Sequence, residues 1–292
     1  MSFREIGQQL RAYRMESGLK AEEISAQLGI SRAALYRYEK GEVIKLETVT
    51  RLADMLKISP LTLLGIGVEY YAKPASYAER LRALEEVADQ ILQFFGPVCY
   101  LLTSDEYDKT LSQIFEEHIA STATSLQTAQ AEAEQLISLM LTRKKTYQTR
   151  KPAVIALLTV SSVRRFLAEG LVPAAQVSSS TRAQARTTAC HEMEQIACLM
   201  ESEPLGLQLG LMAKEDPNGP FALFRSRDRA SLALNLFASD ALATTSCGVA
   251  MLTTAEDAVA IHQRAFEQVW PEAIKGTAAA QRIRELIMES RA

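Results

Sequence analysis

Several residue types and patterns are scarce in this 292-residue sequence, and each scarcity narrows the protein's class. The cysteines are too few and too scattered for a disulfide scaffold. They are Cys99, Cys190, Cys198 and Cys247. There is no apolar run of about eighteen residues, so we expect no transmembrane helix. The start, Met-Ser-Phe-Arg-Glu-Ile, lacks the pattern of a secretory leader, and we expect a cytoplasmic protein without membrane contact.

Net charge is also small, at −3, in a composition that is otherwise ordinary for a globular protein. The length favours two domains. Residues 1–70 hold ten Lys and Arg against nine Asp and Glu, and the remainder holds 22 against 26. This balance lowers the expected non-specific affinity for nucleic acid, but local basic patches can still support binding to a specific site.

The first part of the chain has the pattern of short, closely packed helices. Apolar residues recur at spacings of three and four, and the segments are broken at Gly18, Gly29 and Gly41. Ser31 is a favourable N-cap for the third segment. We therefore expect an all-α domain of five helices over residues 1–68.

The third of these segments has an outward face suited to the major groove of DNA. Arg32 and Arg37 lie on neighbouring faces of one helix, and arginine can bond two acceptors of guanine. Nearby lysines suit phosphates, which set register without reading sequence. The residues expected to contact DNA are Lys20, Ser31, Arg32, Ala33, Tyr36, Arg37, Lys40 and Lys45. The alternative is a small helical bundle that serves only dimerisation or partner docking.

Residues 4–65 resemble the helix-turn-helix domain of the XRE family, which includes the phage repressors and Cro proteins. The matching pieces are Leu10-x-x-x-Arg14, Gly18-Leu19, Glu23-Ile24-Ser25, Leu28-Gly29-Ile30-Ser31, Leu35-x-x-Tyr38-Glu39-x-Gly41 and Leu52-Ala53. The resemblance implies that Arg32, Ala33 and Arg37 face bases. It also implies an internal ion pair between Arg14 and Glu39. The sequence departs from the family at Lys20, where a Thr or Asn cap is usual.

Residues 69–96 are expected to form a linker and a dimerisation helix. Apolar residues recur there at spacings of three and four, which is the seam pattern of paired helices. They are Leu81, Leu84, Ala88, Ile91 and Phe95. The alternative is an amphipathic helix packed on its own domain.

Residues 97–292 mix short apolar runs with helical patterns, which indicates an α/β or α+β domain. Expected strands are 98–102, 153–158, 207–212, 221–224, 232–237 and 249–252. Expected helices are 107–119, 126–143, a short one through Val163 and Leu167, 183–203, 255–270 and 277–290. Residues 203–208 faintly resemble the carboxyl-terminal halves of longer XRE-type regulators. A phospholipase-D-like sensor fold would be inactive here, because His118, His191 and His262 each lack the Lys of the His-x-Lys signature.

Candidate chemical sites are weak. Cys190, His191, Glu194 and Cys198 could share one helix face and suit zinc or copper(I), although isolated helix cysteines usually act as small hydrophobes. Residues 143–151 hold five cations and could bind an anion or simply form a solvated helix end. Because phosphate loops and nucleophile motifs are lacking, we expect neither an enzyme, nor a cofactor, nor a bound metal.

These patterns together predict a transcriptional regulator that binds operator DNA, palindromic in sequence, as a homodimer or a higher homo-oligomer. Its larger domain, over residues 97–292, would sense a small-molecule effector or mediate assembly. One alternative is an antitoxin-like repressor whose larger domain binds a protein. Another is an enzyme fused to a DNA-binding domain.

Overall fold

The computed structural model describes residues 3–64, 67–94, 96, 98–123, 125–172, 175–213, 220–235 and 248–291. Its amino-terminal part consists of short helices, as the sequence predicts. These are α1 (Phe3–Ser17), α2 (Ala21–Leu28), α3 (Arg32–Glu39), α4 (Leu46–Leu56) and α5 (Pro60–Leu63). Gly18 and Gly29 end the first two with φ of 72° and 68°, a conformation that glycine adopts without steric cost.

From Val68 onward, the described residues build a mixed sheet in the strand order β1-β7-β6-β5-β2-β3-β4-β8. The strands are β1 (Val68–Tyr71), β2 (Gln90–Phe94), β3 (Ala153–Thr159), β4 (Leu207–Met212), β5 (Phe221–Arg225), β6 (Ala230–Asn235), β7 (Ala250–Thr253) and β8 (Ile274–Lys275). The multidomain layout expected from the sequence, an all-α domain followed by a mixed domain, is confirmed.

The sheet combines a parallel centre with antiparallel flanks. Strands β2, β3 and β4 run parallel, whereas the other neighbouring pairs run antiparallel. Parallel neighbours require long crossover connections, and helices supply them here. The expected hairpin joins β5 to β6, where Ser226 N donates to Arg229 O at 2.8 Å.

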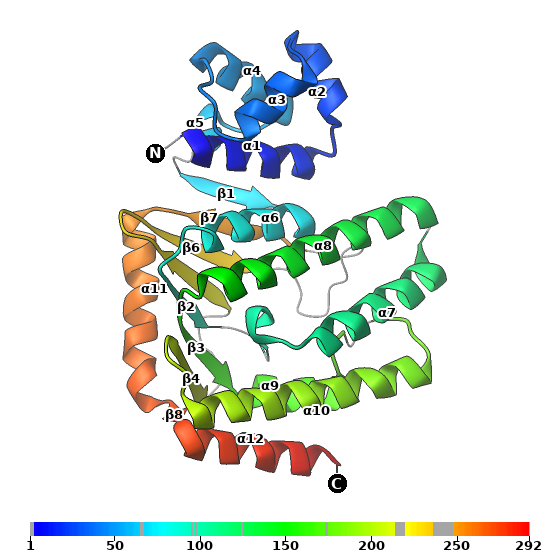
Figure 1. Cartoon of the computed structure of the whole chain (residues 1–292), viewed down its shortest axis with the longest axis vertical. Helices are drawn as coiled ribbons and strands as arrows, with labels where there is room; N and C mark the ends of the chain where they lie inside the picture. The colour runs from blue at the N-terminus through cyan, green and yellow to red at the C-terminus, as the bar shows by residue number, and fades with distance from the viewer. Residues whose placement is uncertain are drawn as a thin grey trace.

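Helices cover both faces of this sheet (Figure 1). One face carries α6 (Pro74–Glu85), α7 (Asp105–Thr122), α8 (Leu126–Arg150), α9 (Val160–Glu169) and α10 (Ser179–Ser202), with α12 (Gly276–Arg291) packed on α10. The other face carries α11 (Glu256–Val269), which buries Phe266 against Leu157 and Phe221 in a separate core. In the described part of the chain, no helix is long and apolar enough to cross a bilayer.

The secondary structure expected over residues 69–96, a linker followed by one helix, is wrong for the described residues of that range, while the dimerisation role stays a prediction. Val68–Tyr71 is an edge strand, α6 ends at Glu85, and Gln90–Phe94 is a central strand. The apolar spacing is misleading because it runs from a helix through a four-residue connection into a buried strand. Helix α6 packs on α8 of its own domain, which was the alternative interpretation. The larger domain therefore begins at Val68 and not at residue 97.

Three other boundaries differ from expectation. The strand expected over residues 98–102 is a single 3₁₀ turn, Tyr100–Leu102, in which Leu101 and the preceding Cys99 are buried without strand pairing. Helix α8 continues to Arg150 instead of ending at Arg143, and α10 begins at Ser179. Cys247 and the end of the strand expected over 232–237 lie outside the described residues.

Candidate nucleic-acid interface

Helix α3 is held in the amino-terminal domain by a cap, a buried side chain and an ion pair. Ser31 Oγ accepts a hydrogen bond from Ala34 N at 3.1 Å, which satisfies one open amide of the first turn. Leu35 is fully buried. Arg14 donates from Nε and Nη2 to the two oxygens of Glu39 at 2.6 and 3.1 Å. The ion pair that the resemblance implies is therefore present, and it ties the last turn of α3 to α1.

The opposite face of α3 is open to solvent. Its exposed residues are Ser31, Arg32, Ala33, Tyr36, Arg37 and Lys40. Arg32 Nη1 lies 2.8 Å from Glu22, and Arg37 Nε lies 3.3 Å from Glu42. All four side chains are more than half exposed, so these ion pairs are weak and a phosphate or a guanine can replace the carboxylates.

Two further predicted contacts lie at the starts of other helices. Lys20 precedes α2 and Lys45 precedes α4, and both are exposed. The Lys20 amide donates to the Glu23 carboxylate at 2.7 Å, which offsets the missing Thr or Asn cap. A cation next to a helix N-terminus is a favourable arrangement for a phosphate.

Gly7 was not singled out in the sequence, yet it sets the position of α3. A Cβ atom on Gly7 would lie 2.4 Å from the carbonyl oxygen of Tyr38 and 2.6 Å from that of Glu39. Helix α1 can therefore approach the end of α3 this closely only with glycine at this position. A lone glycine inside a helical apolar pattern was the available signal.

Helix α1 is also buried on a second side, against the larger domain, which the sequence does not predict. Glu69 on β1 accepts hydrogen bonds from Arg80 on α6 at 2.8 and 3.0 Å. Gln9 on α1 donates to the same carboxylate at 2.6 Å, and Tyr71 donates at 2.7 Å. The Tyr13 ring stacks on Tyr71 with centroids 5.2 Å apart. These contacts hold the helix-turn-helix region on the edge of the sheet (Figure 1).

Electrostatics keep this buried junction charged. Burial by itself would raise the pKa of Glu69, but Arg80 and the hydrogen bonds from Arg80, Tyr71 and Gln9 bring that pKa below its ordinary value. Glu16 on α1 adds a second tie, because its carboxylate accepts from Ala72 N at 2.7 Å, just before α6 begins. The amino-terminal domain is therefore attached through α1, which leaves α3 outward.

Some of the cations of residues 143–151 form ion pairs inside the protein. Arg143 donates to both oxygens of Glu85, with its shortest contact at 2.7 Å. Lys144 is buried and paired with Asp108. An anion site at the start of this segment is therefore wrong, since these two cations already have buried partners. Lys145, Arg150 and Lys151 are exposed near the end of α8.

The cysteine and histidine cluster on α10 does not form a ligand set. Glu194 is held by Arg284 Nε at 2.8 Å, and Cys198 is exposed beside it. Within the described residues, no group of three or more His, Cys, Asp or Glu side chains could hold a metal ion.

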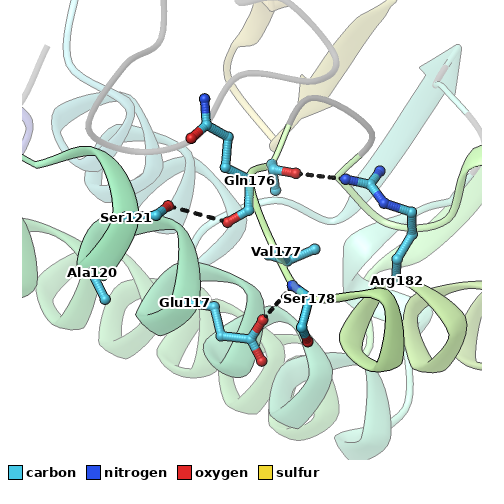
Figure 2. Close-up of a pocket in the computed structure, with 8 residues that line it drawn as sticks. Glu117, Ala120, Ser121, Gln176, Val177, Ser178 and Arg182 are labelled. Carbon is cyan, nitrogen blue, oxygen red and sulfur yellow. Dashed lines mark hydrogen bonds between the residues drawn. The ribbon is translucent and has the colours of Figure 1, made fainter.

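A shallow pocket lies between α7 and the segment before α10, and its polar groups bind one another (Figure 2). Ser178 N donates to Glu117 at 2.8 Å, and Thr181 donates to the same carboxylate. These hydrogen bonds lower the pKa of Glu117 to about 2. Arg182 Nη2 donates to Ala175 O at 2.9 Å. The groups thus fasten this segment to α7 and are not open for a ligand.

Comparison with known proteins identifies the amino-terminal region. Residues 5–63 match the model of a family described as a helix-turn-helix domain. Among solved structures, the chain is similar to TrmBL2, an archaeal chromatin protein whose structure shows a novel mode of DNA binding, at 13% identity and a TM-score of 0.33. That match covers 78% of this chain but only 61% of the other, less than two thirds of its length. No curated protein matches the sequence. Residues 5–63 therefore form a helix-turn-helix domain.

Proposed function

We propose that this protein is a cytoplasmic transcriptional regulator, and not an enzyme, that binds a specific double-stranded operator as a homodimer and whose larger domain senses a small molecule. The observation that carries the proposal is the outward face of α3. There, two arginines are presented from a helix that is fixed at both ends, while their only close acidic neighbours in the described structure are exposed and exchangeable. Membership of the XRE family, suggested by the motifs over residues 4–65, is part of this proposal.

A dimer follows from the reach of one such helix. Helix α3 has eight residues, which corresponds to a length of about 12 Å. A helix of this size reaches only a few base pairs, too few to single out one site in a genome. Two copies spaced by one DNA turn, roughly 34 Å, would double the site and make it palindromic. Sedimentation of the full chain with and without operator DNA measures this stoichiometry.

The test starts from a selection of bound duplexes out of a random-sequence pool by the full-length protein. The affinity of the selected duplex and of a scrambled duplex is then measured at one fixed salt concentration. Replacing Arg32 and Arg37 together with Ala should reduce the preference for the selected duplex. Each bidentate arginine–guanine contact contributes roughly fivefold to 150-fold discrimination.

The matched control is Arg164→Ala, because Arg164 is also a surface arginine paired with an exposed carboxylate, that of Glu289, but lies on the larger domain. The control should bind both duplexes like the wild type. Circular dichroism checks that the double variant stays folded. A double variant that is folded and selects the same sequence with the same affinity ratio would overturn the proposal.

A further inference from the structure

A cavity of about 410 Å³ lies between the sheet and helices α6, α7 and α8. Its floor is low because alanines lie side by side on two neighbouring strands, next to a glutamine on a third. Gln93 on β2 is paired in register with Ala222 on β5, which is paired with Ala233 on β6. Aromatic rings, including those of Tyr77 and Phe115, line the walls. The volume and the apolar lining are those of a small-molecule site.

The polar groups of the cavity carry no net charge. Arg143 is bonded to Glu85, so the two charges cancel. Burial raises the pKa of the Cys99 thiol to about 12 and also raises the pKa of the Tyr77 phenol, which keeps both neutral. A charged ligand would therefore lose its hydration without gaining a partner charge.

One donor in the cavity is still open. Gln93 Oε1 accepts a hydrogen bond from Cys99 Sγ at 3.3 Å, which leaves the amide nitrogen pointing elsewhere. Within the described structure, Gln93 Nε2 has no hydrogen-bond partner, although Gln93 lines the cavity. A ligand carrying a carbonyl or hydroxyl oxygen would satisfy this donor.

Helix α6 lies between the cavity and the helix-turn-helix domain. Tyr77, Leu81 and Glu85, spaced by one turn each, line the cavity. Arg80, on another side of the same helix, joins the buried junction with α1 through Glu69. A neighbouring tie links Glu79 to Arg11 of α1, with Nε and Oε1 3.2 Å apart. A change in the packing of α6 thus acts directly on the helix that carries α3.

From these contacts we infer that the cavity binds a neutral aromatic molecule with a hydrogen-bond acceptor, and that α6 transmits its occupancy to the DNA-binding face. The inference rests on the proposed function, since it assigns the effector site of that regulator. A ligand changes DNA affinity only to the extent that it favours one packing of α6 over another. Coupling through a shared helix is reciprocal, so DNA should change the ligand's affinity by the same factor.

The binding experiment uses the full-length protein with three neutral probes, coumarin, chromone and acetophenone, and with the anion coumarin-3-carboxylate. Ligand-observed NMR and titration calorimetry should detect the neutral probes and not the anion. Ala222→Leu raises the cavity floor and should abolish binding. Ala120→Leu, at the exposed shallow pocket of Figure 2, is the matched control and should bind as the wild type does.

A second variant keeps the test valid if Ala222→Leu does not fold. Gln93→Leu preserves much of the volume but removes the donor, so coumarin should bind roughly threefold to tenfold more weakly. Naphthalene, which has no acceptor, should not lose affinity for this variant. Equal effects on coumarin and naphthalene would overturn the role of Gln93. Failure of all three neutral probes to bind would overturn the cavity assignment.

The coupling is measured as the affinity for the selected duplex with and without saturating coumarin. A change of roughly fivefold or more that disappears in Ala222→Leu supports transmission through α6. Coumarin binding without any change in DNA affinity overturns the transmission. Coumarin binding in a protein that selects no duplex leaves the cavity in place and overturns the proposed function instead. Specific DNA binding without any probe binding overturns the inference alone.

Discussion

Two arginine–glutamate ion pairs have the same N–O distance but differ in burial. One lies on the helix-turn-helix domain and the other in the larger domain. Arg32 and Glu22 lie 2.8 Å apart with side chains 56% and 54% exposed. Arg80 and Glu69 also lie 2.8 Å apart, but with side chains only 5% and 7% exposed. The same contact is an exchangeable surface pair in one place and a permanent junction in the other.

The difference follows from solvation. Water and salt screen the exposed pair, so its glutamate holds Arg32 loosely and can give way to nucleic acid. The buried pair has lost its water, and Glu69 is further satisfied by Gln9 and Tyr71. Removing one partner there strands a charge in the interior. The helix-turn-helix domain is thus held by buried contacts where it joins the larger domain. On the face where DNA would bind, its arginines can exchange their partners.

The largest effect is expected from Arg80→Met. It leaves the Glu69 carboxylate buried without its counter-charge, which should lower the free energy of unfolding by about 3–5 kcal/mol. Chemical denaturation of the full chain measures the loss.

A double variant sharpens this prediction. Adding Glu69→Gln to Arg80→Met removes the stranded charge while keeping polar atoms near Gln9 and Tyr71, so most of the stability should return. Arg164→Met, at a pair that is 55% and 48% exposed, is the surface control. If Arg80→Met proves as mild as this control, burial does not distinguish the two kinds of pair.

Gly7→Ala should have the next largest effect, because α1 carries both the buried junction and the support of α3. The added methyl would meet the backbone oxygens of Tyr38 and Glu39, neither of which can rotate away. Overpacking of this kind costs about 1–3 kcal/mol. Gly96→Ala, where an added Cβ meets none of the described atoms within 4 Å, is the control. Equal unfolding midpoints for the two variants would contradict the close approach of α1 to α3.

The local patterns that the sequence predicts well are those set by neighbouring residues. The five short helices, the Ser31 cap and most strands follow from apolar spacing, caps and glycine breaks, which act over a few residues. The helix predicted across residues 86–94 is wrong because the apolar spacing of α6 continues through Ile91 into β2. Only the pairing of β2 with β3 and β5, far along the chain, identifies it as a strand.

The outward face of α3 could be predicted for the same reason, since the helical period alone separates Leu35 from Arg32 and Arg37. The junction could not. Gln9 and Glu69 are polar residues, and polar residues are normally placed on the surface unless a partner is known. Their burial depends on Arg80, which a one-dimensional pattern does not connect to α1. The cavity likewise depends on strands pairing Gln93 with Ala222.

Ser31→Ala removes the N-cap of α3, which lies between the buried side of this helix and the exposed side that carries the arginines. Losing the hydrogen bond to Ala34 N should lower the free energy of unfolding by about 1 kcal/mol. Ser31→Thr retains a cap and should lose less. Thermal unfolding of both variants provides the measurement. Equal losses for Ala and Thr would show that the cap does not hold α3.

Glu22→Gln should have the smallest effect on stability and a gain in DNA affinity. The variant removes an exposed carboxylate that pairs with Arg32, so the unfolding midpoint should stay within experimental error. Binding to the selected duplex should strengthen by about fivefold at most, since Arg32 no longer has to leave an acidic partner. Glu289→Gln, at the surface pair with Arg164, should change neither quantity. A clear loss of stability in Glu22→Gln would mean that the exposed pair is structural after all. Weaker DNA binding would mean that Glu22 positions Arg32 for the groove instead of competing with it.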